Sequence, residues 1–248
     1  MCGICGITWD NKELIKQMGS ACKHRGPEHE GFYVDDHVSL CCERLRIIDL
    51  SDKASQPIHN EDQTIWVVLN GEIYNFRDLR QTLEKKHNFY TNTDTEVIVH
   101  AYEEFGENCL QKLDGMFAFA IYDKQDGSLF IARDRIGIKP LLIYQDEDKI
   151  IFASEMKALM AFNIGKVLDR ISLFTYLQLN YIPAPDTIFT NVKKIAPGSY
   201  MKIKDGKITT RQYYSIPNEW DNVKPVTDLN YDKAKSTLHD LIDNAVKT

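Results

Sequence analysis

The sequence contains no apolar run near the roughly 20 residues that a helix needs to cross a bilayer, and its N-terminus lacks the basic and then apolar layout of a signal peptide. It also lacks a basic stripe, because 30 Lys and Arg residues are interspersed with 36 Asp and Glu residues, for a formal net charge of -6. Such a surface does not neutralise a row of phosphates. We therefore expect neither a membrane protein nor a nucleic-acid-binding protein, and we expect the chain to be cytoplasmic.

A complete set of metal ligands is also missing. Cys2 and Cys5 have the spacing of half a zinc or redox site, but Cys41 and Cys42 are adjacent and no histidine pair has the spacing to complete it. A chain of 248 residues can bury enough apolar surface to fold without disulfides, which a cytosol would reduce. We expect free thiols and no metal or cofactor in this chain, with a zinc or redox role of Cys2 and Cys5 as an alternative. The cysteines are Cys2, Cys5, Cys22, Cys41, Cys42 and Cys109.

Short apolar runs separated by closely spaced turn residues predict an α+β domain rather than repeated βαβ units. One of these runs ends at Asn70-Gly71, a pair that is typical of a tight turn. Two others flank Asp126-Gly127, which is a strong hairpin signal. The expected strands cover residues 3–9, 38–42, 64–69, 116–122 and 129–132.

Two segments have the apolar spacing of helices. Asp94 or a neighbouring threonine can cap a helix whose apolar side chains share one face. Residues 77–86 predict a second helix, with Leu79 and Leu83 four residues apart and a charged outer face. The shared face of the first helix consists of Val97, Ile98, Ala101, Tyr102 and Phe105.

A polar segment marked by Pro217 and Pro225 follows Ile216 and predicts a linker. Beyond it, residues 231–246 carry one apolar helical stripe. We expect a domain at residues 1–216, and at residues 217–248 a linker and the first helix of a further domain.

Cys2 can combine a nucleophile and a base in one residue. Its small side chain favours removal of Met1, which would leave a cysteine that carries its own α-amine. The ordinary pKa of an α-amine is about 7.7 to 8.0 and that of a thiol about 8.5, so the two groups can exchange a proton near neutral pH. This is the arrangement of an N-terminal nucleophile, although an early cysteine is more often merely buried.

Three further sites have ordinary roles when each is taken alone. Asn70-Gly71 can close a turn, Arg44 can be a surface base, and Asp94 can cap a helix. An asparagine amide followed by a glycine N–H can also form an oxyanion hole for acyl transfer.

In combination, these residues lie within motifs that resemble the class II glutamine amidotransferase domain, of the N-terminal nucleophile type. Within that class, the chain resembles glutamine-hydrolysing asparagine synthetases from residue 1 to about residue 216. The motifs are Met1-Cys2-Gly3-Ile4-Cys5-Gly6, His24-Arg25-Gly26-Pro27, Arg44-Leu45-x-Ile47-x-Asp49, Asn70-Gly71-Glu72-Ile73-Tyr74-Asn75, Asp94-Thr95-Glu96, Asp114-Gly115-Met116-Phe117-Ala118, Ala132-Arg133-Asp134-Arg135-x-Gly137-x-Lys139-Pro140 and Phe152-Ala153-Ser154-Glu155-x-Lys157.

The segment Arg44-Leu45-Arg46-Ile47-Ile48-Asp49 favours the asparagine synthetase branch, because relatives that make glucosamine phosphate or phosphoribosylamine have an aromatic residue after this arginine. The segment from Tyr181 to Phe189 and Ala196-Pro197-Gly198 also resemble that branch. Departures are Glu28, where aspartate is more usual, and Leu142-Ile143, where an aromatic pair is usual. Neither touches the expected chemistry.

The resemblance implies a four-layer αββα sandwich of two antiparallel sheets and assigns a role to each site residue. Cys2 would attack the side-chain amide of glutamine, with Asn70 and Gly71 as the oxyanion donors. Arg44 would bind the α-carboxylate of glutamine, and Asp94 its α-ammonium. The other expected contacts, made through main-chain groups, are those of Leu45, Arg46, Ile47, Ile48 and Glu72.

In the resembling ligases of amino-acid biosynthesis, the ammonia reaches a second domain that uses Mg-ATP to activate aspartate. Residues 1–248 contain no glycine- and serine-rich pyrophosphatase loop, so we expect this chain to be the glutaminase half and the synthetase domain to be its partner, with a homodimer as the assembly. Two alternatives stay open. The ammonia acceptor can be a carboxylate other than aspartate, or the domain can be a non-catalytic amino-acid-binding module.

Overall fold

We describe the chain from a computed structural model, which describes residues 1–146, 149–216 and 230–247. The chain divides into two compact units, Met1–Tyr214 and Ser215–Thr248. In the second unit, helix α6 (Tyr231–Lys247) forms where the apolar stripe predicts a helix, and none of its residues is buried. The predicted linker at residues 217–229 lies outside the described residues.

The first unit is built on two six-stranded sheets whose strand pairs are antiparallel. The first sheet has the order β10-β8-β9-β1-β3-β2, and the second has the order β12-β11-β7-β6-β5-β4. Strands of the first sheet are β1 (Gly3–Ile7), β2 (His29–Val34), β3 (Ser39–Arg44), β8 (Leu142–Asp146), β9 (Lys149–Ala153) and β10 (Val192–Lys194). Strands of the second sheet are β4 (Ile58–His59), β5 (Ile65–Ile73), β6 (Gly115–Asp123), β7 (Ser128–Arg133), β11 (Ser199–Lys204) and β12 (Lys207–Gln212).

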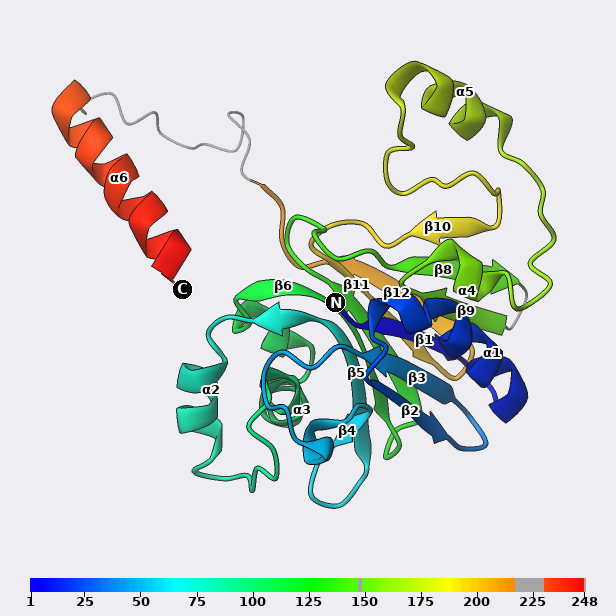
Figure 1. The fold of residues 1–248 in the computed structure, drawn as a ribbon, viewed down its shortest axis with the longest axis horizontal. Coiled ribbons are helices and arrows are strands. Elements are labelled where there is room, and N and C mark those ends of the chain that lie inside the picture. The colour runs from blue at the N-terminus through cyan, green and yellow to red at the C-terminus, as the bar shows by residue number, and fades with distance from the viewer. Residues whose placement is uncertain (147–148, 217–229, 248) are drawn as a thin grey trace. The chain divides into compact units, whose positions relative to one another are not determined.

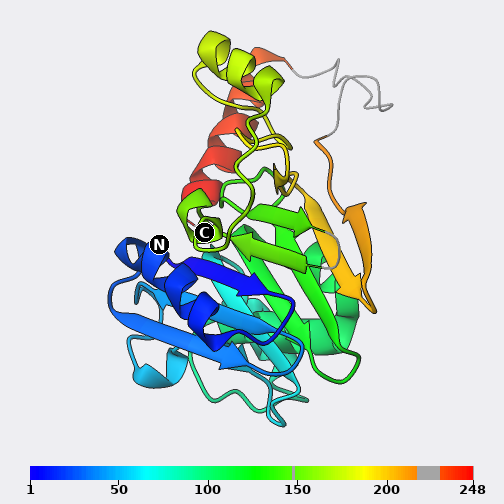
Figure 2. The same cartoon turned by 90° about the vertical axis from the view of Figure 1, so that its right-hand side faces the viewer.

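Helices cover the outer face of each sheet (Figure 1). On the first sheet lie α1 (Lys12–Cys22) and α4 (Met156–Leu159), and on the second lie α2 (Phe76–Leu83) and α3 (Asp94–Phe105). Helix α5 (Arg170–Leu179) stands away from the sheets beyond β10, as Figures 1 and 2 both show. Three-residue and six-residue 3-10 helices occur at Lys23–Arg25, Asp52–Ala54 and Gly106–Gln111.

Three apolar cores separate the four layers. Ile4 of the first sheet and Val68 of the second belong to the core between the sheets. Leu69, the next residue along β5, belongs instead to the core under α3, because successive strand side chains point to opposite faces. The third core joins α1 to the outer face of the first sheet. This arrangement confirms the expected α+β fold, a four-layer αββα sandwich.

The second sheet confirms the hairpin expected around Asp126-Gly127, but the turn expected at Asn70-Gly71 is wrong. Strand β5 continues through this pair to Ile73, and β6 pairs with it along its whole length. A Cβ on Gly71 would lie 2.3 Å from the carbonyl oxygen of Met116, so glycine serves close strand pairing here rather than a turn.

Helix α3 forms where the apolar face predicts it, and its cap is Thr93, one of the two kinds of cap that the sequence allowed. The Thr93 hydroxyl accepts a hydrogen bond from the N–H of Thr95 at 3.3 Å. Helix α2 is shorter than the expected 77–86 and ends at Leu83.

A carboxyl group is buried where β2 and β3 pair. Glu43 of β3 is 1% exposed, and Glu30 lies directly opposite it on β2. Burial, and then the adjacent carboxyl of Glu30, raise the pKa of Glu43 from its ordinary 4.5 to about 7. Ionisation of Glu43 therefore destabilises the fold.

We predict that Glu43→Gln stabilises the protein at pH 8 by on the order of 1 to 3 kcal/mol, with little change at pH 4. Because the folded-state pKa is raised, the wild type has the full contribution of this group below about pH 4.5 and loses it as the pH rises through about 7. Urea unfolding at both pH values measures the difference. The exposed Glu13→Gln is the control, and an equal effect of Glu43→Gln at both pH values would contradict the prediction.

Candidate functional site

Cys2 lies directly before β1 and packs in the core between the sheets. Its Sγ is 3.8 Å from the carbonyl oxygen of Leu45, and its own carbonyl oxygen accepts a 2.9 Å hydrogen bond from Nε of Arg25. Arg25 in turn pairs with Glu155 at 2.9 Å. The backbone at Cys2 is therefore held by Arg25, which Glu155 holds in turn.

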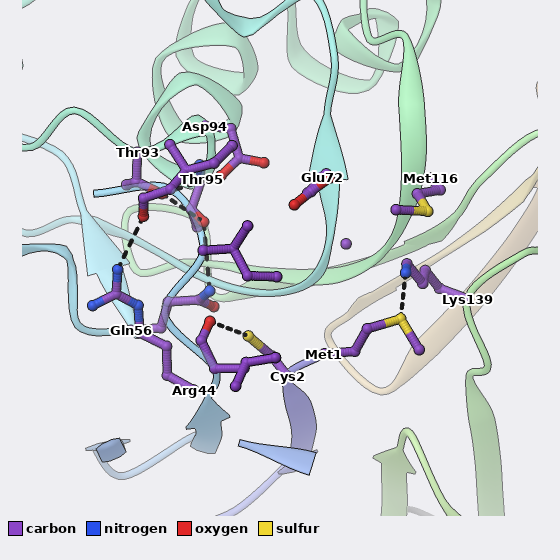
Figure 3. A pocket seen from close by; sticks show the side chains of 14 residues that line it. Met1, Cys2, Arg44, Gln56, Glu72, Thr93, Asp94, Thr95, Met116 and Lys139 are labelled. Atoms are coloured by element: carbon purple, nitrogen blue, oxygen red, sulfur yellow. Dashed lines mark hydrogen bonds between the residues drawn. The ribbon is translucent and has the colours of Figure 1, made fainter. Parts of the chain in front are cut away.

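A cavity of about 50 Å³ opens at Cys2 (Figure 3). Figure 3 shows Cys2 on one side, Asp94 and Thr93 on another, and Met1 reaching toward Lys139. The lining residues are Met1, Cys2, Arg44, Leu45, Ile47, Ile48, Gln56, Gly71, Glu72, Thr93, Asp94, Thr95, Met116 and Lys139.

The Cys2 thiol is the acidic thiol of this region. A hydrogen bond with the Cys42 thiol, and then the backbone of Leu45, the charged amino terminus and Arg44, lower its pKa to about 7 against the opposing effect of burial. Burial raises the pKa of Cys22 and of Cys109 to about 12. Near neutral pH a large fraction of Cys2 is thus thiolate, which is the nucleophilic form.

Backbone N–H groups of β5 face the same cavity. Phe117, opposite Gly71, uses both its N–H and its carbonyl oxygen toward Asp134, so the Gly71 N–H points away from β6. On that same edge of β5, the N–H of Leu69 donates to Oε1 of Gln56 at 2.6 Å, and the N–H of Ile73 donates to Oδ2 of Asp94 at 2.8 Å. The N–H of Gly71 lies between these two capped donors and lines the cavity.

The side chain of Asn70 lies on the face of β5 that points toward the first sheet, in the layer that also contains Cys2. It shares that face with Val68, since strand side chains alternate, and it is 0% exposed. Neither its amide nitrogen nor its amide oxygen has a hydrogen-bond partner among the described residues. A buried amide without a partner is costly, so its donor and acceptor are available to a ligand.

Arg44 lines the cavity and also shapes the loop that follows it. Its Nη1 donates to the carbonyl oxygen of Ser51 at 3.1 Å, and its Nη2 donates to the carbonyl oxygens of Ile48, at 3.2 Å, and Asp49. Asp49 has a positive φ of 52°, and its Oδ2 accepts from the N–H of Asn92 at 2.7 Å. The loop that bounds the cavity is thus tied to Arg44.

Asp94 begins α3 and faces the cavity from the side opposite Cys2 (Figure 3). Thr93 Oγ1 donates to its Oδ1 at 3.1 Å, while Oδ2 accepts from Ile73. Burial raises the pKa of Asp94, the hydrogen bond from Ile73 opposes this shift, and nearby Glu72 adds to it. Two carboxylates on one side of the cavity suit a cationic group there.

The structure brings eight of the ten residues expected in the site to the cavity wall, and the two others lie elsewhere. Asn70 is buried beside the wall, as described above. Arg46 points to the surface, where it pairs with Asp52, and its backbone N–H donates to Oε2 of Glu28 at 2.6 Å. Arg46 therefore serves the loop rather than the cavity.

The sequence argument did not assign six residues of the wall to the site. Lys139 belongs to a quoted motif and is 2% exposed; its Nζ lies 2.6 Å from Sδ of Met1, and burial lowers its pKa. Its place in that motif is the signal that could have identified it. Gln56 gave no such signal, because only the fold brings it to β5. The six are Met1, Gln56, Thr93, Thr95, Met116 and Lys139.

Solved structures with this arrangement share its fold. A structure of the allosteric regulatory enzyme of purine biosynthesis superposes with a TM-score of 0.64 and 21% identity, over 88% of this chain and 50% of that one. Glutamine phosphoribosylpyrophosphate amidotransferase from Bacillus subtilis gives a TM-score of 0.63 and 19% identity, over the same shares. These neighbours define the fold class of the chain as a two-sheet α+β sandwich.

A family model described as a glutamine amidotransferase domain matches residues 1–214. The chain therefore belongs to the glutamine amidotransferase domain family. It is 41% identical over 256 residues to asparagine synthetase [glutamine-hydrolyzing] 1 of Bacillus subtilis, covering 99% of this chain and 39% of that protein. It is 35% identical over 255 residues to asparagine synthetase B [glutamine-hydrolyzing] of Escherichia coli, covering 100% and 40%. The chain thus spans about two fifths of these relatives.

We predict that iodoacetamide modifies Cys2 with a midpoint near pH 7, and that Cys42→Ala moves this midpoint upward by about one pH unit. The thiolate fraction rises with pH through the pKa, and loss of the Cys42 hydrogen bond removes the largest contribution that lowers this pKa. Mass spectrometry of the N-terminal peptide measures the rate. Cys109→Ala is the control, because that thiol lies in the core under α3; an unchanged midpoint in Cys42→Ala would contradict the assignment.

Proposed function

We propose that this domain hydrolyses the side-chain amide of glutamine at Cys2, giving glutamate and ammonia. The observation that carries the proposal is one juxtaposition: a thiol of lowered pKa and the outward N–H of Gly71 line the same cavity, next to the buried amide of Asn70, which has no hydrogen-bond partner among the described residues. A thiol nucleophile beside two hydrogen-bond donors suits acyl transfer.

Removal of Met1 is the first requirement of this mechanism. Met1 lines the cavity, and its sulfur lies beside Lys139. Its loss enlarges the cavity and leaves the α-amine on Cys2 itself. That amine, with an ordinary pKa of about 7.7 to 8.0, can then accept the thiol proton directly or through a water molecule.

The reaction has two halves. The thiolate attacks the carboxamide carbon, a C–S bond forms, and the carbonyl oxygen gains charge where Asn70 and Gly71 can donate to it. The α-ammonium gives its proton to the leaving nitrogen, the C–N bond breaks, and ammonia leaves a thioester. Water then attacks the thioester while the amine accepts its proton, and cleavage of the C–S bond releases glutamate and restores the thiol.

Charges at the two ends of the cavity support recognition of a free amino acid. Asp94 and Glu72 can take the α-ammonium group of glutamine. The guanidinium of Arg44 has five N–H donors and makes three hydrogen bonds to carbonyl oxygens of the loop. Donors therefore remain for the α-carboxylate of glutamine. The backbones of Leu45, Ile47 and Ile48 complete the wall, whereas Arg46 contributes loop contacts only.

The named relatives support a wider role for the whole protein. Because they are asparagine synthetases, we propose that the ammonia passes to a synthetase domain that lies outside this chain, uses Mg-ATP and amidates aspartate. Another carboxylate acceptor remains the alternative. Dimerisation and a cytoplasmic location belong to the same proposal; no helix among the described residues is long and apolar enough to cross a membrane.

Substitution of Cys2 by alanine should abolish glutamate release from glutamine while the domain stays folded, since no other thiol among the described residues lines the cavity. A coupled glutamate assay measures release, and circular dichroism checks the fold. Cys109→Ala, a buried thiol in another core, should keep wild-type activity. Full activity of Cys2→Ala would refute the nucleophile assignment.

Substitution of Asn70 by alanine should lower kcat about a hundredfold to a thousandfold, because one oxyanion donor is lost. The KM for glutamine should change much less, since the donor acts mainly in the transition state. Asn70→Asp keeps the size but removes the donor, so it should lose activity as well. Rates within threefold of wild type in both variants would exclude the amide as an oxyanion donor.

A further inference from the structure

A second group of functional side chains gathers outside the cavity, where three segments of the chain meet at one side of α3. Glu61 lies in the turn after β4, His87 in the loop after α2, and His100 and Glu103 on one face of α3, three residues apart. Only the tertiary structure brings the four together, and none belongs to the amidotransferase motifs.

The donor atoms of this group lie close to one another. His100 Nδ1 lies 2.8 Å from Oε2 of Glu103 and 3.8 Å from Oε2 of Glu61. His87 Nδ1 lies 3.5 Å from the same oxygen of Glu103 and 3.8 Å from Oε1 of Glu61. One donor atom from each residue lies within 4.8 Å of all the others. Tetrahedral zinc with bonds of 2.0 to 2.1 Å needs donors about 3.3 Å apart.

The outward nitrogen of each imidazole lies near a further carboxylate. His87 Nε2 is 3.2 Å from Oε1 of Glu104, and His100 Nε2 is 3.7 Å from Oε1 of Glu96. A carboxylate on the far nitrogen is the usual support of a metal-binding imidazole. Glu104 supplies it for His87, whereas Nε2 of His100 has no hydrogen-bond partner among the described residues and its Nδ1 is hydrogen-bonded to Glu103, a bond that a metal ion would replace.

Both glutamates are oriented in the same way. Asn60 Nδ2 donates to Oε1 of Glu103 at 2.8 Å, which leaves Oε2 directed at the histidines. The N–H of Asn88 donates to Oε1 of Glu61 at 2.7 Å, so the turn and the loop are fixed next to each other. His100 is 0% exposed and the His87 side chain 12%, so the histidine side of the cluster is shielded from water.

We infer that Glu61, His87, His100 and Glu103 bind one divalent transition-metal ion, and that Zn²⁺ fits the four donors best. A donor set of two imidazole nitrogens and two carboxylate oxygens suits Zn²⁺, whereas Mg²⁺ and Ca²⁺ prefer six or more oxygen ligands. With four protein ligands the site is closed, as structural zinc sites are.

The bound ion would fasten two connections to α3, the helix that carries Asp94 at its start. His100 follows Asp94 by six residues, about two turns of helix, so the metal lies along α3 from the cavity rather than in it. Its expected effect is on the stability of this part of the fold. The inference does not depend on the proposed chemistry at Cys2.

The test uses the full chain, stripped with a chelator and titrated with ZnCl₂ by isothermal titration calorimetry. The wild type should bind one Zn²⁺ per chain with a rise in Tm, and Co²⁺ should give the strong visible absorption of a tetrahedral site. His87→Gln and Glu61→Gln should each weaken Zn²⁺ binding at least tenfold. His239→Gln, whose side chain is 80% exposed on α6, should bind as the wild type does.

Other outcomes would overturn the inference. Absence of Zn²⁺ binding by the wild type would show that the four side chains form an ion-pair cluster without a metal. Unchanged binding in His87→Gln and Glu61→Gln would place the metal elsewhere, and loss of binding after alkylation of the thiols would place it at the cysteines. If His87→Gln fails to fold, Glu61→Gln decides, because Glu61 is 35% exposed and tolerates replacement.

Discussion

The face-to-face packing of the two antiparallel sheets is the constraint on which the rest of this structure depends. Ile4 and Leu40 from one sheet and Val68 and Ala120 from the other fill the layer between them. This contact brings the start of β1 against the middle of β5, although the two strands are about 60 residues apart in sequence. Without this packing, Cys2 would be an ordinary chain end, far from Gly71 and the other residues of the cavity.

The site lies where this packing meets the open edge of the second sheet. Strand β4 pairs with β5 only near Val67 and Trp66, so the following part of β5 has no neighbour on that side. Its outward N–H groups must find other acceptors, and Gln56 and Asp94 supply two of them. The edge is thereby protected, except at the glycine where the cavity opens.

Around the cavity, most buried polar side chains have hydrogen-bond partners, and a few of those described have none. Arg25, Arg44 and Asp94 are all bonded to backbone groups, so they define the walls, whereas the amide of Asn70 has no partner among the described residues. Such a division is expected where stability is given up for binding, because a fully satisfied wall would leave nothing to recognise a ligand.

Several elements of the fold are determined by local sequence. The hairpin at Asp126-Gly127, the apolar face of α3 and the apolar stripe of α6 follow from spacing alone, since neighbouring residues determine turns and helices. The motifs also identified Cys2, Gly71 and Asp94 as residues that share one cavity.

What only the tertiary structure decided is how distant segments meet. Asn70-Gly71 has the sequence of a turn, yet β6 pairs across it and keeps β5 extended, because nine paired residues outweigh a local preference. Gln56, Lys139 and the pairing of His87 with His100 could not be read from spacing, since long-range contacts place them. The amino-acid sequence by itself determined the reactive groups and most elements, and the stacking of the sheets determined which of those groups face one another.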